Sequence, residues 1–281
     1  MTEMLLTILT LVLGISALAY YSVLRIRRRA SDLEQRRVFN ALVLPNVGGE
    51  SFDRNQSATL PGPAARYLNR AIAKGTPLSR MVDLELVGRI RSGPDEEWLS
   101  FEARERVRAG FGFLWQARME GIGRMQVAGA DYYLDGEGRS EYFLAEIFPT
   151  VKDKGPEVSR SAAGHLLIES IWLPASLLPT KGARWQAEDD KRTVVSFAGH
   201  PDASALNLTV ADDGALEEVS MMRHQLGKTG HAGLASYGYR VEEESIFGGY
   251  TVPGRVIGSW HIGTDDAFDF LQLRVENALY Y

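Results

Sequence analysis

Hydrophobic and polar residues alternate through most of the chain after residue 80. Every second residue is apolar or nearly so between Met81 and Arg91, and the same period returns from Leu99 to Val107 and from Phe111 to Ala117. Such alternation is typical of strands with one buried and one wet side, as in antiparallel sheets. Further strands are expected over 125–128, 141–147, 185–187, 192–198, 205–211, 216–224, 237–245, 254–261 and 268–280. We therefore predict about ten strands, a sheet so large that it must curl or close.

The most apolar stretch outside the N-terminus interrupts this pattern. It runs from Ser159 to Leu178 and places residues such as Leu167 and Ile171 near a helical period. We expect a helix here, cut by Pro174, laid across the sheet and supplying much of its core. A second helix is expected between Pro61 and Gly75, because proline favours helix starts and glycine favours helix ends. The predicted fold is mainly β (α+β): a large curved antiparallel sheet, as a half-barrel or open barrel, with two packed helices.

An uncharged run from Met4 to Leu24 precedes this domain. As a helix it would span roughly 32 Å, enough to cross a hydrocarbon core. A basic cluster follows from Arg25 to Arg29, whereas Glu3 is the only charged residue before the run. The positive-inside rule then predicts an N-terminal transmembrane helix in the inner (cytoplasmic) membrane, with the large domain in the cytoplasm. A periplasmic or extracellular domain is the alternative.

A cleaved signal peptide would explain the same run. Ala17-Leu18-Ala19 matches a cleavage site of the A-x-A type. However, the residues before the run lack positive charge, and the run is long for a signal peptide. We therefore favour a single-pass anchor.

These features divide the chain into three parts. Residues 1–29 are the anchor with its basic cluster, 30–59 a charged helix and a linker, and 60–281 a single β-rich domain. The first 37 residues carry +3 and the whole chain −5, which leaves −8 on the remainder. This charge argues against nucleic-acid binding, which needs a positive field, whereas the basic cluster suits lipid headgroups. The chain has no Cys, which excludes disulfides and Cys-ligated zinc.

Motifs for cofactors and metals are incomplete. Gly227-Lys228-Thr229 resembles the end of a phosphate-binding loop, but Met222 stands where the first glycine belongs. Gly136-Glu137-Gly138 lacks the third glycine of a dinucleotide fingerprint. His165 and Glu169 have a spacing that can place two ligands on one ion, but the sequence names no third ligand. We therefore predict no metal and no cofactor.

Buried carboxylates raise the alternative of an enzyme. Glu169 lies in the most apolar segment, where burial would raise its pKa. Together with Asp131 or Asp189 it could form an acid–base pair, although carboxylates that cap, turn or pair with Arg are commoner. We name no catalytic residue, and the enzyme remains a rival hypothesis. A third is a membrane-associated scaffold that docks an unidentified protein through a sheet edge.

Aromatic residues are the stronger indication of function. A long curved sheet encloses more volume than side chains easily fill, and such a cavity beside a membrane suits an apolar ligand. The candidate ligand-binding residues are Phe111, Phe113, Trp115, Tyr133, Glu169, Trp172 and Trp260. We predict a membrane-anchored β-rich domain that contacts the lipid bilayer and binds a lipid or another apolar small molecule.

Several blocks of the chain resemble an uncharacterised bacterial family. They include LPGPAARYL at Leu60–Leu68, YYLDGEGR at Tyr132–Arg139 and LLIESIWLPASLLP at Leu166–Pro179. The last contains an E-x-x-W-x-P-x-x-L-L-P pattern that begins at Glu169, and members of the family often carry an N-terminal apolar segment. The resemblance covers roughly residue 60 to the C-terminus. It implies one intact domain and no particular activity.

Overall fold

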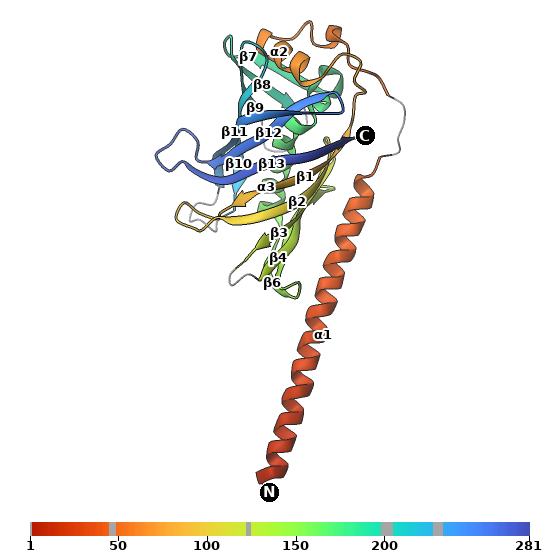
Figure 1. The fold of residues 1–281 in the computed structure, drawn as a ribbon, viewed down its shortest axis with the longest axis vertical. Coiled ribbons are helices and arrows are strands. Elements are labelled where there is room, and N and C mark those ends of the chain that lie inside the picture. Colours follow the sequence, from red (N-terminus) through yellow and green to blue (C-terminus); the bar gives the residue numbers. More distant parts are fainter. Residues whose placement is uncertain (1, 45–48, 122–124, 198–204, 227–232) are drawn as a thin grey trace.

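The computed structural model contains one antiparallel sheet of thirteen strands, the architecture shown in Figure 1. The structure describes all residues except 1, 45–48, 122–124, 198–204 and 227–232. The strands are β1 (Met81–Ile90), β2 (Leu99–Arg108), β3 (Gly112–Glu120), β4 (Gln126–Leu134), β5 (Glu137–Leu144), β6 (Phe148–Lys154), β7 (Ala183–Ala187), β8 (Arg192–Phe197), β9 (Ala205–Val210), β10 (Leu216–Gln225), β11 (Gly233–Phe247), β12 (Tyr250–Trp260) and β13 (Phe268–Tyr280). The predicted large antiparallel sheet is confirmed.

The strand order explains why a helix must cross this sheet. Strands β1 to β6 run as a meander from the centre to one edge, and β7 to β13 run from the other edge back to the centre, where β13 pairs with β1. The segment between β6 and β7 therefore has to travel from one edge to the other. Register shifts in β1, β11 and β12 mark bulges, and bulges increase local twist and bend a sheet.

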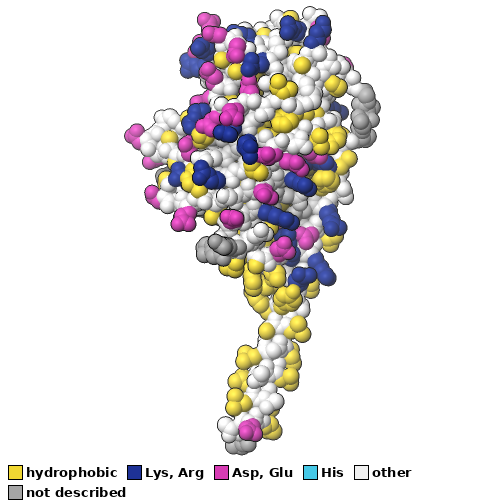
Figure 2. Space-filling model, in the orientation of Figure 1, with side chains coloured by type: hydrophobic (Ala, Val, Ile, Leu, Met, Phe, Trp, Pro, Cys, Tyr) yellow, Lys and Arg dark blue, Asp and Glu magenta, His cyan; other side chains and the backbone are white. Residues whose placement is uncertain are grey.

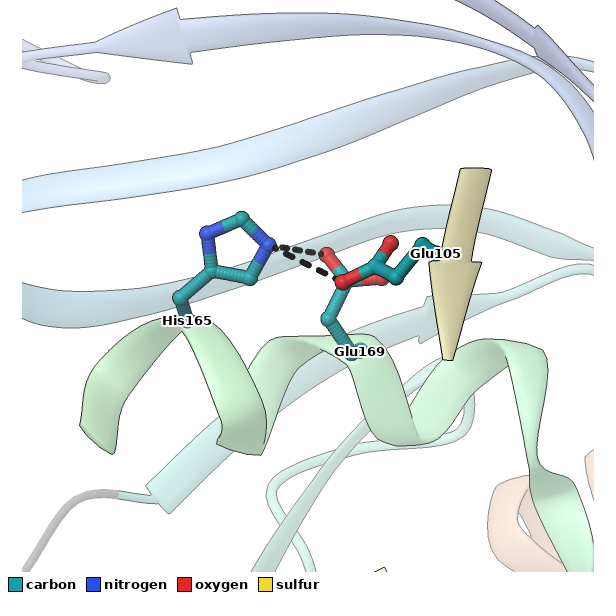
Figure 3. Close-up of side chains that lie close together, drawn as sticks. All are labelled: Glu105, His165 and Glu169. Atoms are coloured by element: carbon teal, nitrogen blue, oxygen red, sulfur yellow. Dashed lines mark ion pairs between the residues drawn. The ribbon is translucent and has the colours of Figure 1, made fainter. Parts of the chain in front are cut away.

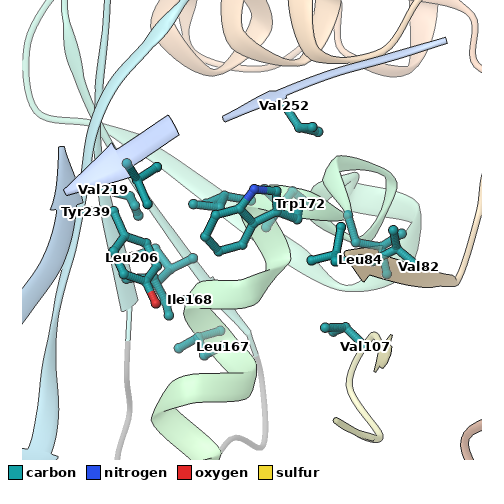
Figure 4. Close-up of a cluster of buried hydrophobic side chains, with 14 of the residues drawn as sticks. Val82, Leu84, Val107, Leu167, Ile168, Trp172, Leu206, Val219, Tyr239 and Val252 are labelled. Carbon is teal, nitrogen blue, oxygen red and sulfur yellow. The ribbon is translucent and has the colours of Figure 1, made fainter. Parts of the chain in front are cut away.

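The crossing segment is not the helix expected over 159–178. It consists of α3 (Pro156–Ile168) and three short 3₁₀ helices, η3 (Glu169–Trp172), η4 (Pro174–Leu177) and η5 (Pro179–Lys181). Pro174 and Pro179 begin η4 and η5, and neither has the N–H that an α-helix continuing through them would use. Nearly every residue from Leu166 to Leu178 is buried, and Figure 4 shows Trp172 surrounded by apolar side chains from both halves of the sheet.

The remaining helices cover the ends and outside of the domain. Helix α2 (Gly62–Ala71) confirms the helix expected after Pro61 and buries its apolar stripe against β7, β9 and β12.

The segment 141–147, expected to be the last strand before the crossing segment, instead forms the end of β5 and the turn into β6. Strand β6 was not predicted, because it is a largely exposed edge strand whose residues show no clear alternation of apolar and polar side chains.

Part of the segment expected to be a linker is packed. Phe52 is 1 % exposed within the main core, and Ser51 forms a bridge with Pro77. Asp53 caps a short 3₁₀ helix, η1 (Arg54–Gln56), in which Gln56 completes the capping box. These contacts attach the residues before α2 to the domain.

Helix α1 (Thr2–Leu42) joins the apolar run and the charged segment into one helix. The part around residues 4–23 is exposed and projects from the domain as the apolar stalk in Figure 2. The C-terminal half packs on the outer face of the sheet, where Val38 and Leu42 are fully buried against Leu114 and Tyr132. Among the described residues, α1 is the one helix long and apolar enough to cross a membrane.

Candidate functional site

A pocket lies between the N-terminal half of α3 and one rim of the sheet. At this rim β1, β3, β10 and β12 end, and β2, β11 and β13 begin. Its volume is about 340 Å³, within the range of roughly 300–1,000 Å³ typical of small-molecule sites. The walls are mainly apolar and aromatic, from Phe101, Trp115, Met119, Trp260, Phe270 and Leu271. Polar side chains on the lining include Asp131, His165, Arg223 and Gln225.

A second cavity of about 460 Å³ lies on the other side of the crossing segment. Leu166, Leu167 and Leu173 form part of its wall, and Tyr133 contributes an aromatic ring. Two cavities therefore flank the crossing segment. The first has the larger number of aromatic side chains on its lining.

The aromatic candidates from the sequence are distributed over three places. Trp115 and Trp260 line the first pocket, and Tyr133 lines the second cavity. Phe113 is 1 % exposed and stacks on the His165 ring, with 4.5 Å between ring centroids. These positions follow from strand alternation, because the inward residues of β3 face α3.

Two other aromatic candidates line neither of these cavities. Phe111 lies on the outer face beside α1, where the Arg108 guanidinium sits 4.0 Å from its ring centroid. The alternating pattern that includes Phe111 breaks at the β2–β3 turn, so its side chain leaves the inner face. Trp172 is buried core, and its indole N–H donates to the Pro253 carbonyl at 2.8 Å.

Three ionisable side chains meet beneath the pocket (Figure 3). Glu105 comes from β2, His165 from α3 and Glu169 from the start of η3. His165 Nε2 lies 3.1 Å from Glu169 Oε1 and 3.6 Å from Glu105 Oε1. The Glu105 side chain is fully buried, and neither of its oxygens has a hydrogen-bond partner among the described residues. Each carboxylate therefore depends on the same imidazole for charge compensation.

Burial and charge perturb the protonation of this cluster. Loss of hydration, reinforced by the nearby Glu169 charge, raises the pKa of Glu105 to about 8. Burial alone would lower the pKa of His165, but the Glu169 and Glu105 carboxylates outweigh it and raise the pKa to about 9. A proton on Glu105 and one on the imidazole therefore stabilise the cluster near neutral pH.

Two tyrosines extend the cluster into the core. The Tyr239 hydroxyl donates to Glu169 Oε1 at 3.3 Å, and the Tyr237 hydroxyl lies 2.8 Å from that of Tyr239. Burial raises the pKa of both phenols above its usual value, which keeps them neutral donors. Glu169 thus accepts a hydrogen bond from Tyr239, pairs with His165 and lines neither of the two cavities.

Arg223, on β10, lies on the pocket side of His165. Its Nε donates to the Ser161 carbonyl at 3.0 Å, and its Nη2 lies 3.4 Å from His165 Nδ1. The guanidinium sits over the Tyr237 ring at 4.5 Å and near the Trp260 ring at 5.6 Å. The cation is thereby held between aromatic faces and α3.

The cluster matches a metal site in ligand type but not in its hydrogen bonds. Glu105, His165 and Glu169 each offer one ligand atom, and these atoms lie within 4.8 Å of one another. A histidine that binds metal through Nε2 normally donates its Nδ1–H to an acceptor. Here Nδ1 faces the Arg223 donor. A neutral ring that accepts from Arg223 at Nδ1 carries its hydrogen on Nε2, and the imidazolium carries one there as well. In both states Nε2 is protonated and cannot bind a metal ion. The contacts of His165 therefore differ from those of a typical metal-binding histidine.

The carboxylate partners suggested for Glu169 lie elsewhere. Asp189 is exposed in the β7–β8 turn, where hydrogen bonds from the Lys191 backbone and from Arg192 lower its pKa to about 2. Asp189 stabilises that turn through these hydrogen bonds. Asp131 lines the pocket and accepts a 2.7 Å hydrogen bond from the Tyr142 hydroxyl. The carboxylate that the fold does bring to Glu169 is Glu105.

Sequence reasoning missed Glu105, Arg223, Tyr237 and Tyr239. Glu105 stands between Ala103 and Val107 in the inward-facing series of β2, so a charged residue at an inward position was the available signal. The two tyrosines occupy alternate positions of β11 and share its inner face. Arg223 carried no signal, because its burial depends on the distant α3.

Comparison with known proteins gives a family match and two similar structures. A family model described as a family of unknown function (DUF6544) matches residues 50–273. A LolA superfamily protein from Nitrosomonas europaea is 11 % identical, with 78 % of this chain and 92 % of that chain covered at a TM-score of 0.42. A DUF1329 family protein from Desulfovibrio piger is 10 % identical, with 78 % and 90 % covered, also at 0.42. No curated protein matches the sequence.

Proposed function

The chain belongs to DUF6544, a family of unknown function, and we propose that it is a membrane-anchored protein whose β domain binds a lipid or another apolar small molecule. The proposed binding site is the pocket between α3 and the sheet rim. The observation that carries the proposal is its volume of about 340 Å³ behind aromatic and Met side chains. Binding of an apolar ligand in such a cavity is favourable, because apolar surface of the ligand and of the pocket is removed from water.

The anchor is supported by the exposure of α1. Leu5, Leu9 and Leu13 are each more than half exposed, as are most apolar side chains along this part of the helix. An apolar surface of this extent is unstable in water and suits a hydrocarbon core. The basic cluster that follows it favours a cytoplasmic domain.

The enzyme hypothesis has less support. Glu169 is 2 % exposed, is held by His165 and Tyr239, and does not reach the pocket. A general acid or base must come within hydrogen-bond reach of its substrate. We therefore assign Glu169 a structural role beneath the ligand.

Lipid analysis of the full-length chain tests the binding proposal. The chain would be purified from membranes in a non-ionic detergent, extracted with organic solvent and examined by mass spectrometry. Ala117 is 4 % exposed on the pocket wall, so Ala117→Phe should fill the cavity. Ala73 is exposed near the end of α2, so Ala73→Phe adds the same ring outside the pocket.

We expect one lipid species to be enriched with the wild type and Ala73→Phe and to be lost from Ala117→Phe. Trp115→Asp, which places a charge in the same wall, should give the same loss and serves if the larger side chain prevents folding. Circular dichroism would establish that each variant is folded. Equal lipid content in all four proteins would contradict the proposed pocket.

A further inference from the structure

Arg223 is a half-buried cation on the pocket wall without a carboxylate partner among the described residues. The guanidinium contacts a backbone carbonyl, an imidazole and two aromatic faces. None of these groups carries a full negative charge. Removing a guanidinium from water without a counterion is costly, and cation–π contacts recover only part of that cost.

The carboxylates around the pocket have other partners. Asp131 on the lining accepts a hydrogen bond from the Tyr142 hydroxyl. Glu105 and Glu169 both face His165 Nε2, whereas Arg223 faces Nδ1 on the opposite side of the ring. The imidazole therefore stands between the carboxylates and the guanidinium. The guanidinium uses Nε for the Ser161 carbonyl and Nη2 for the imidazole, so Nη1 takes part in neither contact and its donors can serve an anion in the pocket.

The fold makes room for Arg223 at this position. Gly164 of α3 lies against its aliphatic stem, and a Cβ at 164 would come within 2.9 Å of Arg223 Cγ. Glycine within a helix is less stable than alanine, so its presence here comes with a loss of helix stability. The close approach allows the stem to pass between α3 and the sheet and to present the charge at the pocket.

Apolar walls with a cation that lacks a carboxylate partner match an amphiphile with an anionic head. Arg91 also lines the pocket, but its guanidinium donates to the Asp269 and Pro94 carbonyls. Trp115, Met119 and Phe270 offer surface for an alkyl chain, and Arg223 offers donors that fit a carboxylate or a phosphate. We propose that the pocket selects amphiphiles whose anionic headgroup pairs with Arg223. This inference rests on the proposed binding function and specifies the class of ligand.

Ligands that share a ten-carbon alkyl chain and differ in their polar headgroup test the inference. The full-length chain would be held in a non-ionic amphipol and titrated with decanoate, decyl phosphate or decan-1-ol, with tryptophan fluorescence and calorimetry as readouts. Trp115 and Trp260 report on the pocket itself. We expect at least one anionic ligand to bind about tenfold or more tightly than the alcohol, because hydrogen bonds between two charged groups are stronger than those to a neutral hydroxyl.

Arg223→Gln should abolish this preference, measured as the ratio of the affinities for the anionic ligand and for decan-1-ol. Arg255 is an exposed arginine on β12 that pairs with Glu243, so Arg255→Gln is the matched control and should retain the preference. Arg223→Lys keeps the charge and should retain part of it. If Arg223→Gln does not fold, the lysine variant decides: a preserved preference for anions supports the inference, and a folded lysine variant without it overturns it.

The remaining outcomes separate this inference from the function beneath it. Equal affinity of the wild type for all three ligands would overturn the role of Arg223 and leave the apolar pocket intact. If Arg223→Gln lowers the affinity for all three ligands equally, the arginine has a structural role, and this result would also overturn the inference. Failure of every ligand to bind the wild type would contradict the proposed function itself. A preference between decanoate and decyl phosphate identifies the headgroup.

Discussion

Glu105 links the stability of the domain to pH. Its carboxyl group is buried, and its pKa rises from the usual 4.5 to about 8. The pKa of His165 likewise rises, from 6.5 to about 9, so both groups hold protons in the folded state that they release in the unfolded state. The folded chain therefore binds more protons than the unfolded chain between about pH 5 and 9. Under linkage, the free energy of unfolding falls as pH rises across this range.

Glu105→Gln should weaken that dependence. The amide keeps the shape of a protonated carboxyl but cannot ionise, so we expect little change in stability near pH 5 and a gain at pH 9. The gain should be on the order of a few kcal/mol, the cost of an uncompensated buried charge. Urea denaturation of the full-length chain in detergent between pH 5 and 9 would measure it. Glu102→Gln removes an exposed carboxylate from the same strand and should leave the slope unchanged; an unchanged slope for Glu105→Gln would refute the role of Glu105.

For single residues, the sequence predicts which face of a strand or helix a side chain occupies better than it predicts which distant side chain it contacts. Alternation in β3 indicates that Phe113 and Trp115 lie on one face, and helical spacing brings His165 to Glu169. Neither pattern reveals Glu105 as the third member of the cluster, because that contact joins residues about sixty positions apart. Trp172 illustrates the converse, since an aromatic residue in an apolar block is equally compatible with a pocket and with a core.

The crossing segment is the element that divides the concave side of the sheet into two cavities. It must pass close to β5 to reach its position, and Gly138 is where the two meet. The Gly138 amide donates to Ser159 Oγ at 2.9 Å. A Cβ at residue 138 would come within 2.7 Å of the Val158 carbonyl and 2.8 Å of Ala162 Cβ. Backbone atoms of α3 cannot yield as a flexible side chain can.

Gly138→Ala should therefore destabilise the domain by about 1–3 kcal/mol, the usual cost of overpacking. Gly93 lies in the loop between β1 and β2, and its added Cβ would meet only a Glu96 side-chain atom at 3.5 Å. Gly93→Ala is the control and should be nearly neutral. Thermal unfolding of both variants under identical conditions measures the difference. Equal melting temperatures would show that α3 does not pack on β5 at this distance.

The elements were predictable to different degrees for physical reasons. Inward–outward alternation revealed β1, β2 and β3, because each has one buried and one exposed face. Strand β6 went undetected because it lies at an edge and buries little. The crossing segment was recognised as apolar, and Pro174 marked a break in it. Its division into three 3₁₀ helices was not predicted, because Leu167 and Ile171 also fit the period of one continuous helix.

Helix α1 presents two kinds of surface along its length. The N-terminal part of α1 exposes apolar side chains, whereas the C-terminal part carries charges and packs on the sheet. Arg28 lies between the two parts, paired with Asp32 and positioned over the Phe143 ring at 4.9 Å. An inserted α1 would therefore hold the domain, with its pocket, close to the membrane surface.

The orientation of α1 can be measured directly because the chain contains no Cys. Thr2→Cys places a single thiol before the apolar run, and Ser100→Cys places one on an exposed position of β2. With an impermeant maleimide applied to intact spheroplasts, the positive-inside rule predicts labelling of Thr2→Cys and protection of Ser100→Cys until the membrane is permeabilised. The reverse pattern would keep the anchor and place the domain outside. Loss of the Thr2→Cys thiol from the mature chain, together with a smaller intact mass, would instead identify residues 1–19 as a cleaved signal peptide, and the packed C-terminal half of α1 would then remain as part of a released domain.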